Sequence, residues 1–147
     1  ADLPNLHYCR QVFQEVLRYY PPSPMLPRTA LDSDTLDGYP VNKGAITLLF
    51  FHGLHHNPTY WDSPEVFDPD RFTPERVEAR DRFAYLPFST GPRQCIGSEF
   101  AMMEGVIALA MLLQHYQVEI VAGQDFTPNL SATLKPRNGV HARLHKR

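Results

Sequence analysis

One short stretch of the sequence concentrates the residues that could do chemistry. Cys95, one of two cysteines among 147 residues, lies in "PFSTGPRQCIGSEF". It comes just before an apolar helix pattern, and the free amides and dipole of a helix N-terminus favour a thiolate. Arg93 adds a cation two residues away. Pro92 stiffens the turn, while Gly91 and Gly97 permit backbone conformations and close contacts that a Cβ atom would prevent.

Several chemistries could use Cys95. A disulfide with Cys9 would close a very long loop, and two cysteines fit a reducing compartment better than a disulfide framework. Zinc would need more ligands, and the sequence holds no CxxC motif. Three histidines are clustered elsewhere in the sequence: His52, His55 and His56. A nucleophilic cysteine would need a histidine partner that sequence alone does not place. The local features best suit a thiolate ligand to a metal carried by a cofactor.

A pair of oppositely charged residues lies in the predicted first helix. Glu15 and Arg18 are three residues apart and therefore share one face of it. Taken alone, the pair predicts a solvated ion pair worth a few tenths of a kcal/mol. The alternative is a buried pair in which the guanidinium binds several acceptors. The opposite face carries an apolar stripe at about 100° per residue, which makes Cys9 a small core residue. The stripe is Leu6, Cys9, Phe13, Val16 and Tyr20.

The elements that must position these residues follow from turn signals and periodicity. Pro4 opens a helix over about 4–20, which "PPSP" ends, and a buried helix over 98–116 has Ser98 as its N-cap. Between them the sequence predicts a hairpin and strand (31–51), a long loop (57–84) and the cysteine loop (85–97). The hairpin turns are Asp37-Gly38 and Asn42-Lys43-Gly44. Short strands follow over 117–145, with "KPRNG" as a turn between two of them.

Composition narrows the functional classes. A net charge of −2 gives no electrostatic indication of nucleic-acid binding. The start of the sequence has no signal-peptide pattern. The longest apolar stretch, 100–113, is shorter than the about 20 residues that span a bilayer. The length suits about one domain, but the sequence starts without methionine, so we expect a piece of a longer protein.

Three motifs together resemble the cytochrome P450 family. "FSTGPRQCIG" is similar to its heme-binding signature Phe-x-x-Gly-x-Arg-x-Cys-x-Gly, "EVLR" to its Glu-x-x-Arg helix and "PDRF" to its Pro-x-Arg-Phe element. The spacing between them is also similar. "LHHNPTYWDSPEVFDPDRF" resembles the segment leading to that arginine, with His56 and Asn57 where arginine and aspartate are more usual. The resemblance covers essentially the whole chain. It implies a mainly α fold with small β-sheets (α+β), of which residues 1–147 form the C-terminal heme-thiolate portion of a single larger domain.

The resemblance also implies the cofactor, heme b (iron protoporphyrin IX), and its contacts. Cys95 would be the thiolate ligand of the iron. Arg93 would pair with one heme propionate, and Arg28, in "PRTALDSDTLDG", resembles a second propionate-binding arginine; the alternative is a surface arginine at a strand edge. Phe88 would pack beside the heme and shield the sulfur. The remaining implied cofactor contacts are Gly91, Ile96, Gly97 and Ala101.

Other residues acquire roles through the same resemblance. Glu15, Arg18 and Arg71 would form the family's buried Glu-Arg-Arg network, which replaces the interpretation of a solvated pair and explains why the long loop returns to the first helix. Removing one partner would leave a buried charge uncompensated. Two segments resemble substrate-facing turns, for which ordinary core packing is the alternative. They are Met25 with Leu26, and Leu130 to Ala132.

The implied activity is a monooxygenase reaction that inserts one oxygen atom from O2 into a small apolar organic substrate. Electrons would come from a redox partner, a flavin reductase or a ferredoxin-type protein, on the proximal face, and the setting would be cytoplasmic or cytoplasm-facing. The family's catalytic distal residues have no match in these 147 residues, so we expect a fragment of a longer enzyme. The alternatives are a non-enzymatic heme-thiolate binding or sensor module, an inactive fragment, and a relative that uses peroxide directly.

Overall fold

The computed structural model describes residues 3–130 and 133–147 and shows helices with small sheets. The helices are η1 (Leu3–Asn5), α1 (His7–Tyr19), α2 (Phe51–His55), η2 (Pro69–Phe72), α3 (Pro74–Ala79), η3 (Gly91–Arg93) and α4 (Ser98–His115). The strands are β1 (Leu26–Thr29), β2 (Asp34–Leu36), β3 (Tyr39–Val41), β4 (Ile46–Leu49), β5 (Tyr116–Ile120), β6 (Pro128–Leu130), β7 (Leu134–Pro136) and β8 (Ala142–Lys146). The predicted combination of helices with small β-sheets is confirmed.

The strands pair as small antiparallel hairpins and ribbons: β1 with β4, β2 with β3, β5 with β8, and β6 with β7. The β2–β3 turn is the predicted Asp37-Gly38, and both residues have positive φ (48° and 81°), the backbone of a type I′ hairpin. The predicted turn at Asn42 is also present, closed by a 2.9 Å bond from the Ala45 N–H to the Asn42 carbonyl. Between β7 and β8, the Gly139 N–H donates to the Pro136 carbonyl.

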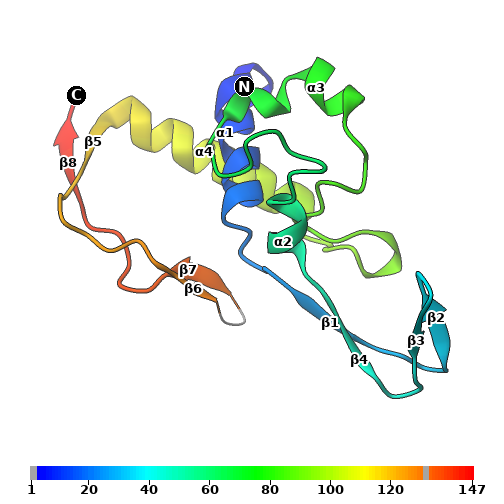
Figure 1. Cartoon of the computed structure of the whole chain (residues 1–147). Helices are drawn as coiled ribbons and strands as arrows, with labels where there is room; N and C mark the ends of the chain where they lie inside the picture. The colour runs from blue at the N-terminus through cyan, green and yellow to red at the C-terminus, as the bar shows by residue number, and fades with distance from the viewer. Residues whose placement is uncertain (1–2, 131–132) are drawn as a thin grey trace.

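The helices gather at the centre of the molecule, and the strands extend from it as two arms (Figure 1). One arm carries β1 and β4 and ends in the β2–β3 hairpin. The other arm follows the C-terminal end of α4 and carries β5 to β8. The cysteine loop runs between α3 and α4, within the central part.

Several predicted boundaries need correction. The first helix begins at His7, because Pro4 lies in the separate 3-10 turn η1. Ser98 is the first residue of α4 rather than its N-cap; that position belongs to Gly97, and no side chain caps the helix. The short elements β1 and α2 were not predicted, since their few residues carry too little periodicity to be recognised.

The apolar stripe predicted for α1 is less buried than expected. Its buried residues are Glu15, Leu17 and Arg18, whereas Val16 and Tyr20, both on the expected apolar stripe, are exposed to 36% and 43%. The reason is that α1 packs against the polar loop that contains η2. A buried ionic group therefore determines which face of the helix is turned inward.

Within this chain, α4 is also less buried than predicted. Only Met102 and Val106 are buried in it, and several large apolar side chains face outward. These are Phe100, Met103, Ile107, Met111, Leu112 and Leu113. Among the described residues, α1 and η1 are the helices that pack on α4, and two neighbours cannot cover a helix that is apolar all round. None of the helices that the structure describes combines the length and apolarity required to cross a membrane.

An aromatic cluster fills the centre of the long loop. The Phe72 and Tyr85 rings meet edge to face with centroids 4.8 Å apart, and Trp61 lies 6.1 Å from Phe72. The Arg80 guanidinium stacks on this cluster, 4.2 Å from the Trp61 ring and 4.7 Å from the Phe72 ring. The loop over 57–84 is therefore ordered by side-chain packing despite its shortage of regular structure.

The closest approach between α1 and α4 depends on Gly105. A Cβ atom at this position would collide with the Phe13 ring. We expect Gly105→Leu to displace Phe13 and lower the free energy of unfolding by about 1–3 kcal/mol, the usual cost of overpacking. Urea denaturation measures the change. In a Phe13→Ala background the same substitution should cost clearly less; an equal cost in both backgrounds would contradict this packing.

Candidate functional site

Glu15 and Arg18 form a fully buried ion pair on α1. Arg18 Nε donates to Glu15 Oε2 at 2.7 Å, and Arg18 Nη2 donates to Glu15 Oε1 at 2.9 Å. Both side chains have 0% exposure. The two parallel bonds give the strong bidentate geometry of an arginine–carboxylate pair. The pair is therefore not the solvated surface contact that the helix pattern alone predicts.

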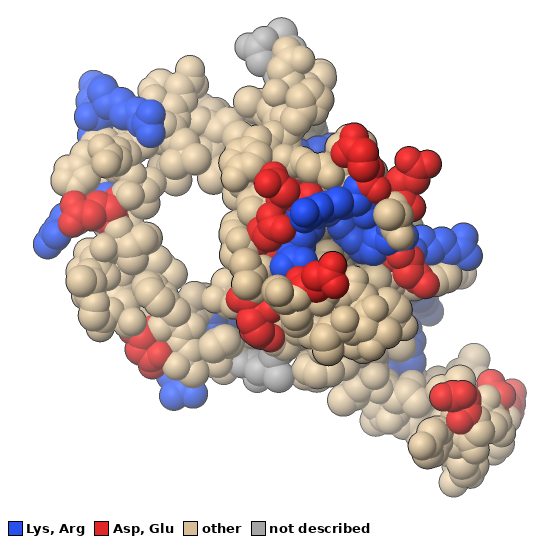
Figure 2. Space-filling model, turned by 45° about the horizontal axis from the view of Figure 1, so that its top comes forward, with Lys and Arg blue, Asp and Glu red and all other residues tan. Residues whose placement is uncertain are grey.

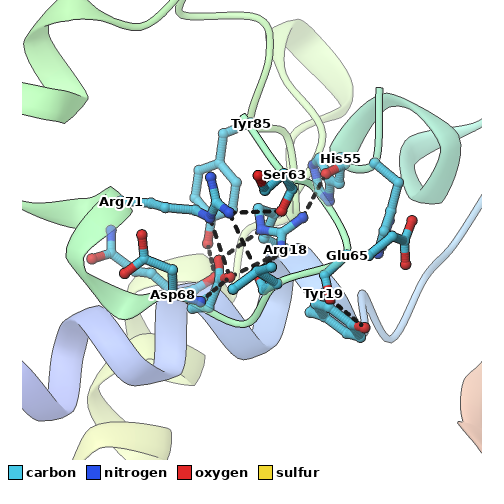
Figure 3. A network of polar contacts seen from close by, with 12 residues as sticks. Arg18, Tyr19, His55, Ser63, Glu65, Asp68, Arg71 and Tyr85 are labelled. Atoms are coloured by element: carbon cyan, nitrogen blue, oxygen red, sulfur yellow. Dashed lines mark hydrogen bonds and ion pairs between the residues drawn. The ribbon is translucent and has the colours of Figure 1, made fainter. Parts of the chain in front are cut away.

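The long loop brings Arg71 to the same carboxylate (Figure 3). Arg71 Nε lies 3.6 Å from Glu15 Oε1, and its Nη2 donates to the Ser63 carbonyl at 2.9 Å. The Asp68 N–H donates to Glu15 Oε1 at 2.8 Å, so backbone and side chain of the loop both bind the carboxylate. The structure thus brings together all three residues of the expected network.

His55, at the end of α2, touches this network and is itself fully buried. Its carbonyl accepts a 2.8 Å bond from Arg18 Nη1, and its ring Nε2 accepts a 2.9 Å bond from the Leu86 N–H. Burial lowers the pKa of His55 to about 4, and repulsion from Arg18, His56 and His52 acts in the same direction. The ring is therefore neutral at neutral pH.

The histidine cluster is not a metal site. Over residues 3–130 and 133–147, no group of three His, Cys, Asp or Glu side chains could hold a metal ion. The rings of His52 and His56 lie against each other with centroids 4.2 Å apart, and His56 Nδ1 bonds to the His52 carbonyl at 2.9 Å. His55 points instead into the interior beside Arg18 (Figure 3).

The cysteine loop presents Cys95 at the surface. The Cys95 N–H donates to the Phe88 carbonyl at 2.9 Å, which closes the loop around the short helix η3. Gly91 has φ +70°, a conformation that favours glycine, and Ser89 adopts a similar φ of 62°. Gly97 has an ordinary φ of −88°, and an added Cβ would lie 3.9 Å from the Cys95 sulfur, so its backbone does not require glycine. Cys95 and Cys9 are both free thiols.

Two adjoining cavities open beside the loop and share Arg93. The first, about 330 Å³, is lined by Cys95, Phe88 and Leu26, with Leu17 of α1 in its wall. The second, about 440 Å³, is lined by Arg28 and Arg93 together with apolar side chains of β4 and α2. Among the described residues, neither guanidinium pairs with a carboxylate. A thiol and two uncompensated cations therefore line these two adjoining cavities, which we call the hollow.

A larger cavity of about 550 Å³ lies on the other side of the network but differs in charge. It is lined by Arg71, Arg76 and Arg80, with Asp62 and Asp68 among them. Arg76 pairs with Asp68 at 3.1 Å, and Arg80 stacks on aromatic rings. Figure 2 shows a face of the molecule on which basic side chains are closely bordered by carboxylates. Two of the three arginines pair with carboxylates, Arg71 with Glu15 and Arg76 with Asp68, so this cavity is the weaker candidate for binding an anion.

The other expected site residues differ in their burial and in whether they line the cavities. Ile96 is fully exposed beside Cys95, whereas Ala101 is half-buried in the first turn of α4. Of the expected substrate-facing residues, Leu26 lines the cavity with Cys95 and Met25 is half-buried nearby in sequence. Leu130 ends β6, and Ala132 lies outside the described residues.

Sequence reasoning missed the partners that complete the network. They are backbone groups, the carbonyls of His55, Ser63 and Val66 and the amide of Asp68. Tyr85, whose hydroxyl donates to the Gln14 carbonyl at 2.9 Å, was also missed. No residue type identifies a backbone acceptor, so only the "PDRF" and "LHHNP" motifs pointed to this region.

We expect Glu15→Gln to lower the free energy of unfolding by about 3–5 kcal/mol, because it leaves two buried guanidinium groups without a carboxylate. Chemical denaturation followed by circular dichroism measures the loss. Asp32→Asn is the matched control, since it breaks the exposed ion pair with Lys43 and should leave the midpoint unchanged. Equal effects of the two substitutions would contradict the special position of Glu15.

The low pKa of His55 predicts a loss of stability in acid. The unfolded chain protonates this histidine near pH 6.5, whereas the folded protein does so only near pH 4. Stability is therefore complete above pH 6.5 and falls by roughly 3 kcal/mol as the pH drops from 6.5 to 4. The difference between the wild type and His55→Gln, measured by denaturation at several pH values, isolates this contribution. Parallel pH profiles for the two proteins would contradict it.

Known proteins are similar to this chain in both sequence and fold. Residues 1–142 match the family model described as Cytochrome P450. Cytochrome P450 4A14 of Rattus norvegicus is 41% identical over 145 residues, which cover 98% of this chain and 28% of the relative. Cytochrome P450 4V2 of Homo sapiens is 37% identical over 147 residues, 99% of this chain and 28% of the relative.

Solved structures of cytochrome P450 proteins have the same fold as this chain. The chain superimposes with a TM-score of 0.87 and 32% identity on the cytochrome P450DA heme domain, covering 95% of this chain and 30% of that one. A retinoic acid-bound cyanobacterial P450 gives a TM-score of 0.89 at 31% identity, with 99% and 34% covered. The chain thus spans about three tenths of the length of these relatives. In sequence and in structure, it belongs to the cytochrome P450 family.

Proposed function

We propose that this chain is the heme-binding part of a monooxygenase that inserts one oxygen atom from O2 into an organic substrate. The observation that carries the proposal is the hollow in which the free thiol of Cys95 lies beside two arginines that no described carboxylate compensates. Heme combines an iron that binds sulfur with two anionic propionates at one edge. The donor set of the hollow matches both features.

The surroundings of Cys95 suit a flat, apolar macrocycle. Ile96 follows it with a fully exposed side chain, and Phe100 in the next turn is 65% exposed. Burying such apolar surface is favourable by about 25 cal/mol per Å². The residues present therefore fit heme b, with Cys95 as the iron ligand. A heme bound by thiolate supplies oxygen activation, because the thiolate donates electron density that favours O–O cleavage.

The two arginines would bind the propionates. Arg93 and Arg28 come from the cysteine loop and from β1, and they line the same 440 Å³ cavity. A guanidinium binds a carboxylate through two parallel hydrogen bonds, which fixes its orientation as well as its position. Arg28 now donates to the neighbouring Pro27 carbonyl at 2.9 Å, and this local bond is easily exchanged for a carboxylate.

The remaining residues would position and shield the thiolate. Phe88 lines the cavity with Cys95 and accepts the Cys95 N–H, so it both orients the loop and covers the sulfur side. Gly91 allows the positive φ on which the turn depends. Glu15, Arg18 and Arg71 would lock the helix and loop behind the cysteine. Leu26 would face the substrate from β1.

Turnover requires partners outside this chain. Electrons would come from a flavin reductase or a ferredoxin-type protein that docks on the proximal face, the side of Cys95. The substrate would be a small apolar organic molecule, as the family resemblance implies. A cytoplasmic or cytoplasm-facing setting accords with two free cysteines.

The expected result for Cys95→Ser is loss of thiolate ligation. The reduced, carbon monoxide-treated heme protein should show a strongly red-shifted Soret band, and Cys95→Ser should lose it because an alcohol is a poor iron ligand. Cys9→Ser is the matched control and should keep the band. A red-shifted band that persists in Cys95→Ser, or one absent from the wild type despite bound heme, would refute the proposal.

A further inference from the structure

His55 joins the buried ion pair to the cysteine loop through two different groups. Its backbone carbonyl accepts from Arg18 Nη1 at 2.8 Å, and its ring Nε2 accepts from the Leu86 N–H at 2.9 Å. The residue has 0% exposure, so water does not compete for either bond. Figure 3 shows the side chain beside Arg18 and below the segment that carries Tyr85.

The protonation state of the ring follows from its partner. A backbone amide can only donate, so Nε2 must be the unprotonated nitrogen, and the neutral ring carries its proton on Nδ1. The groups around the ring support neutrality: the charge of Arg18 on α1, His52 on α2 and His56 at the C-cap of α2 oppose a positive charge, and Tyr85 of the loop packs against the ring at 5.4 Å. A protonated ring would point a donor at the Leu86 N–H and break the contact.

Leu86 lies where the cysteine loop begins. Its carbonyl accepts the Ser89 N–H at 3.2 Å, and the adjacent Phe88 carbonyl accepts the Cys95 N–H at 2.9 Å. Ser89 has a φ of 62°, which is costly for a residue with a side chain and persists only where the surroundings hold it. Two hydrogen bonds fix the start of this strained turn to the core: the Leu86 N–H donates to His55 Nε2, and the hydroxyl of the preceding Tyr85 donates to the Gln14 carbonyl at 2.9 Å.

We propose that His55 is a positioning residue for Cys95: by binding the Leu86 amide through Nε2, it fixes the loop that presents the thiolate to the heme iron. The inference rests on the proposed function, because it concerns the same ligand. It adds a residue outside the three signature motifs, and it gives the buried ion pair a direct connection to the cysteine loop.

The test compares substitutions that keep or remove the acceptor. The glutamine amide reaches the position of Nε2, whereas the shorter asparagine amide reaches only that of Nδ1. We expect His55→Gln to retain the Leu86 bond and His55→Asn to lose it. His56→Asn makes the same change one residue away, on a ring that bonds to the His52 carbonyl rather than to the cysteine loop.

The measured quantity is the ratio of non-thiolate to thiolate forms in the reduced, carbon monoxide-bound heme protein, read from the Soret band. His55→Asn should raise this ratio about tenfold, the change expected when one hydrogen bond is lost. His55→Gln and His56→Asn should match the wild type. In the heme-free protein, hydrogen exchange at the Leu86 and Cys95 amides should accelerate in His55→Asn alone.

The outcomes separate this inference from the proposed function. If the wild type shows no red-shifted band, the proposed function is refuted. If the wild type shows the band and His55→Asn has the same band ratio and the same amide exchange rates, the role of His55 is refuted. If His55→Asn does not fold, an ester bond in place of the Leu86 amide removes the donor and keeps every side chain. That ester variant should show the same tenfold rise, and an unchanged ratio would overturn the inference.

Discussion

The complete burial of the Glu15–Arg18 ion pair is the constraint on which the rest of the structure depends. Charges removed from water are tolerated only when nearly every donor and acceptor is satisfied. The carboxylate receives Arg18 twice, the Asp68 amide and the nearby Arg71. Arg18 also donates to the carbonyls of His55 and Val66. Satisfying two side chains therefore requires α1, the end of α2 and the long loop to meet at one place.

The same helix separates this network from the candidate site. Leu17 lies between the two charged residues in sequence, is almost completely buried, and forms part of the wall of the cavity that holds Cys95. One face of α1 thus carries the charges and another borders the thiol. A displacement of α1 would disturb both, so the buried charges bear directly on the geometry of the cysteine loop.

Polar contacts hold the long loop against α1. The aromatic cluster of Trp61, Phe72 and Tyr85 is covered by an arginine, and α4 leaves much of its apolar surface exposed. Hydrogen bonds and ion pairs depend strongly on geometry, whereas apolar contacts tolerate small shifts. A loop held by such bonds has one well-defined position, which is what a metal-binding thiolate requires.

The sequence by itself determined the local features of this protein. The Asp37-Gly38 turn, the turn before β4, the long helix after Cys95 and the three motifs all depend on residues close together in the chain, and each was predictable from residue type and spacing. Burial was not predictable from periodicity: the helix pattern of α1 alone pointed to a solvated Glu15–Arg18 pair, and only the family motifs pointed to a buried one, whereas α4 leaves apolar residues outside within this chain. The role of His55 was also hidden, because its partners are backbone groups from distant segments. Local backbone preferences are set by neighbours in sequence, but burial and hydrogen-bond partners are set by neighbours in space, and only the tertiary structure decides which residues those are.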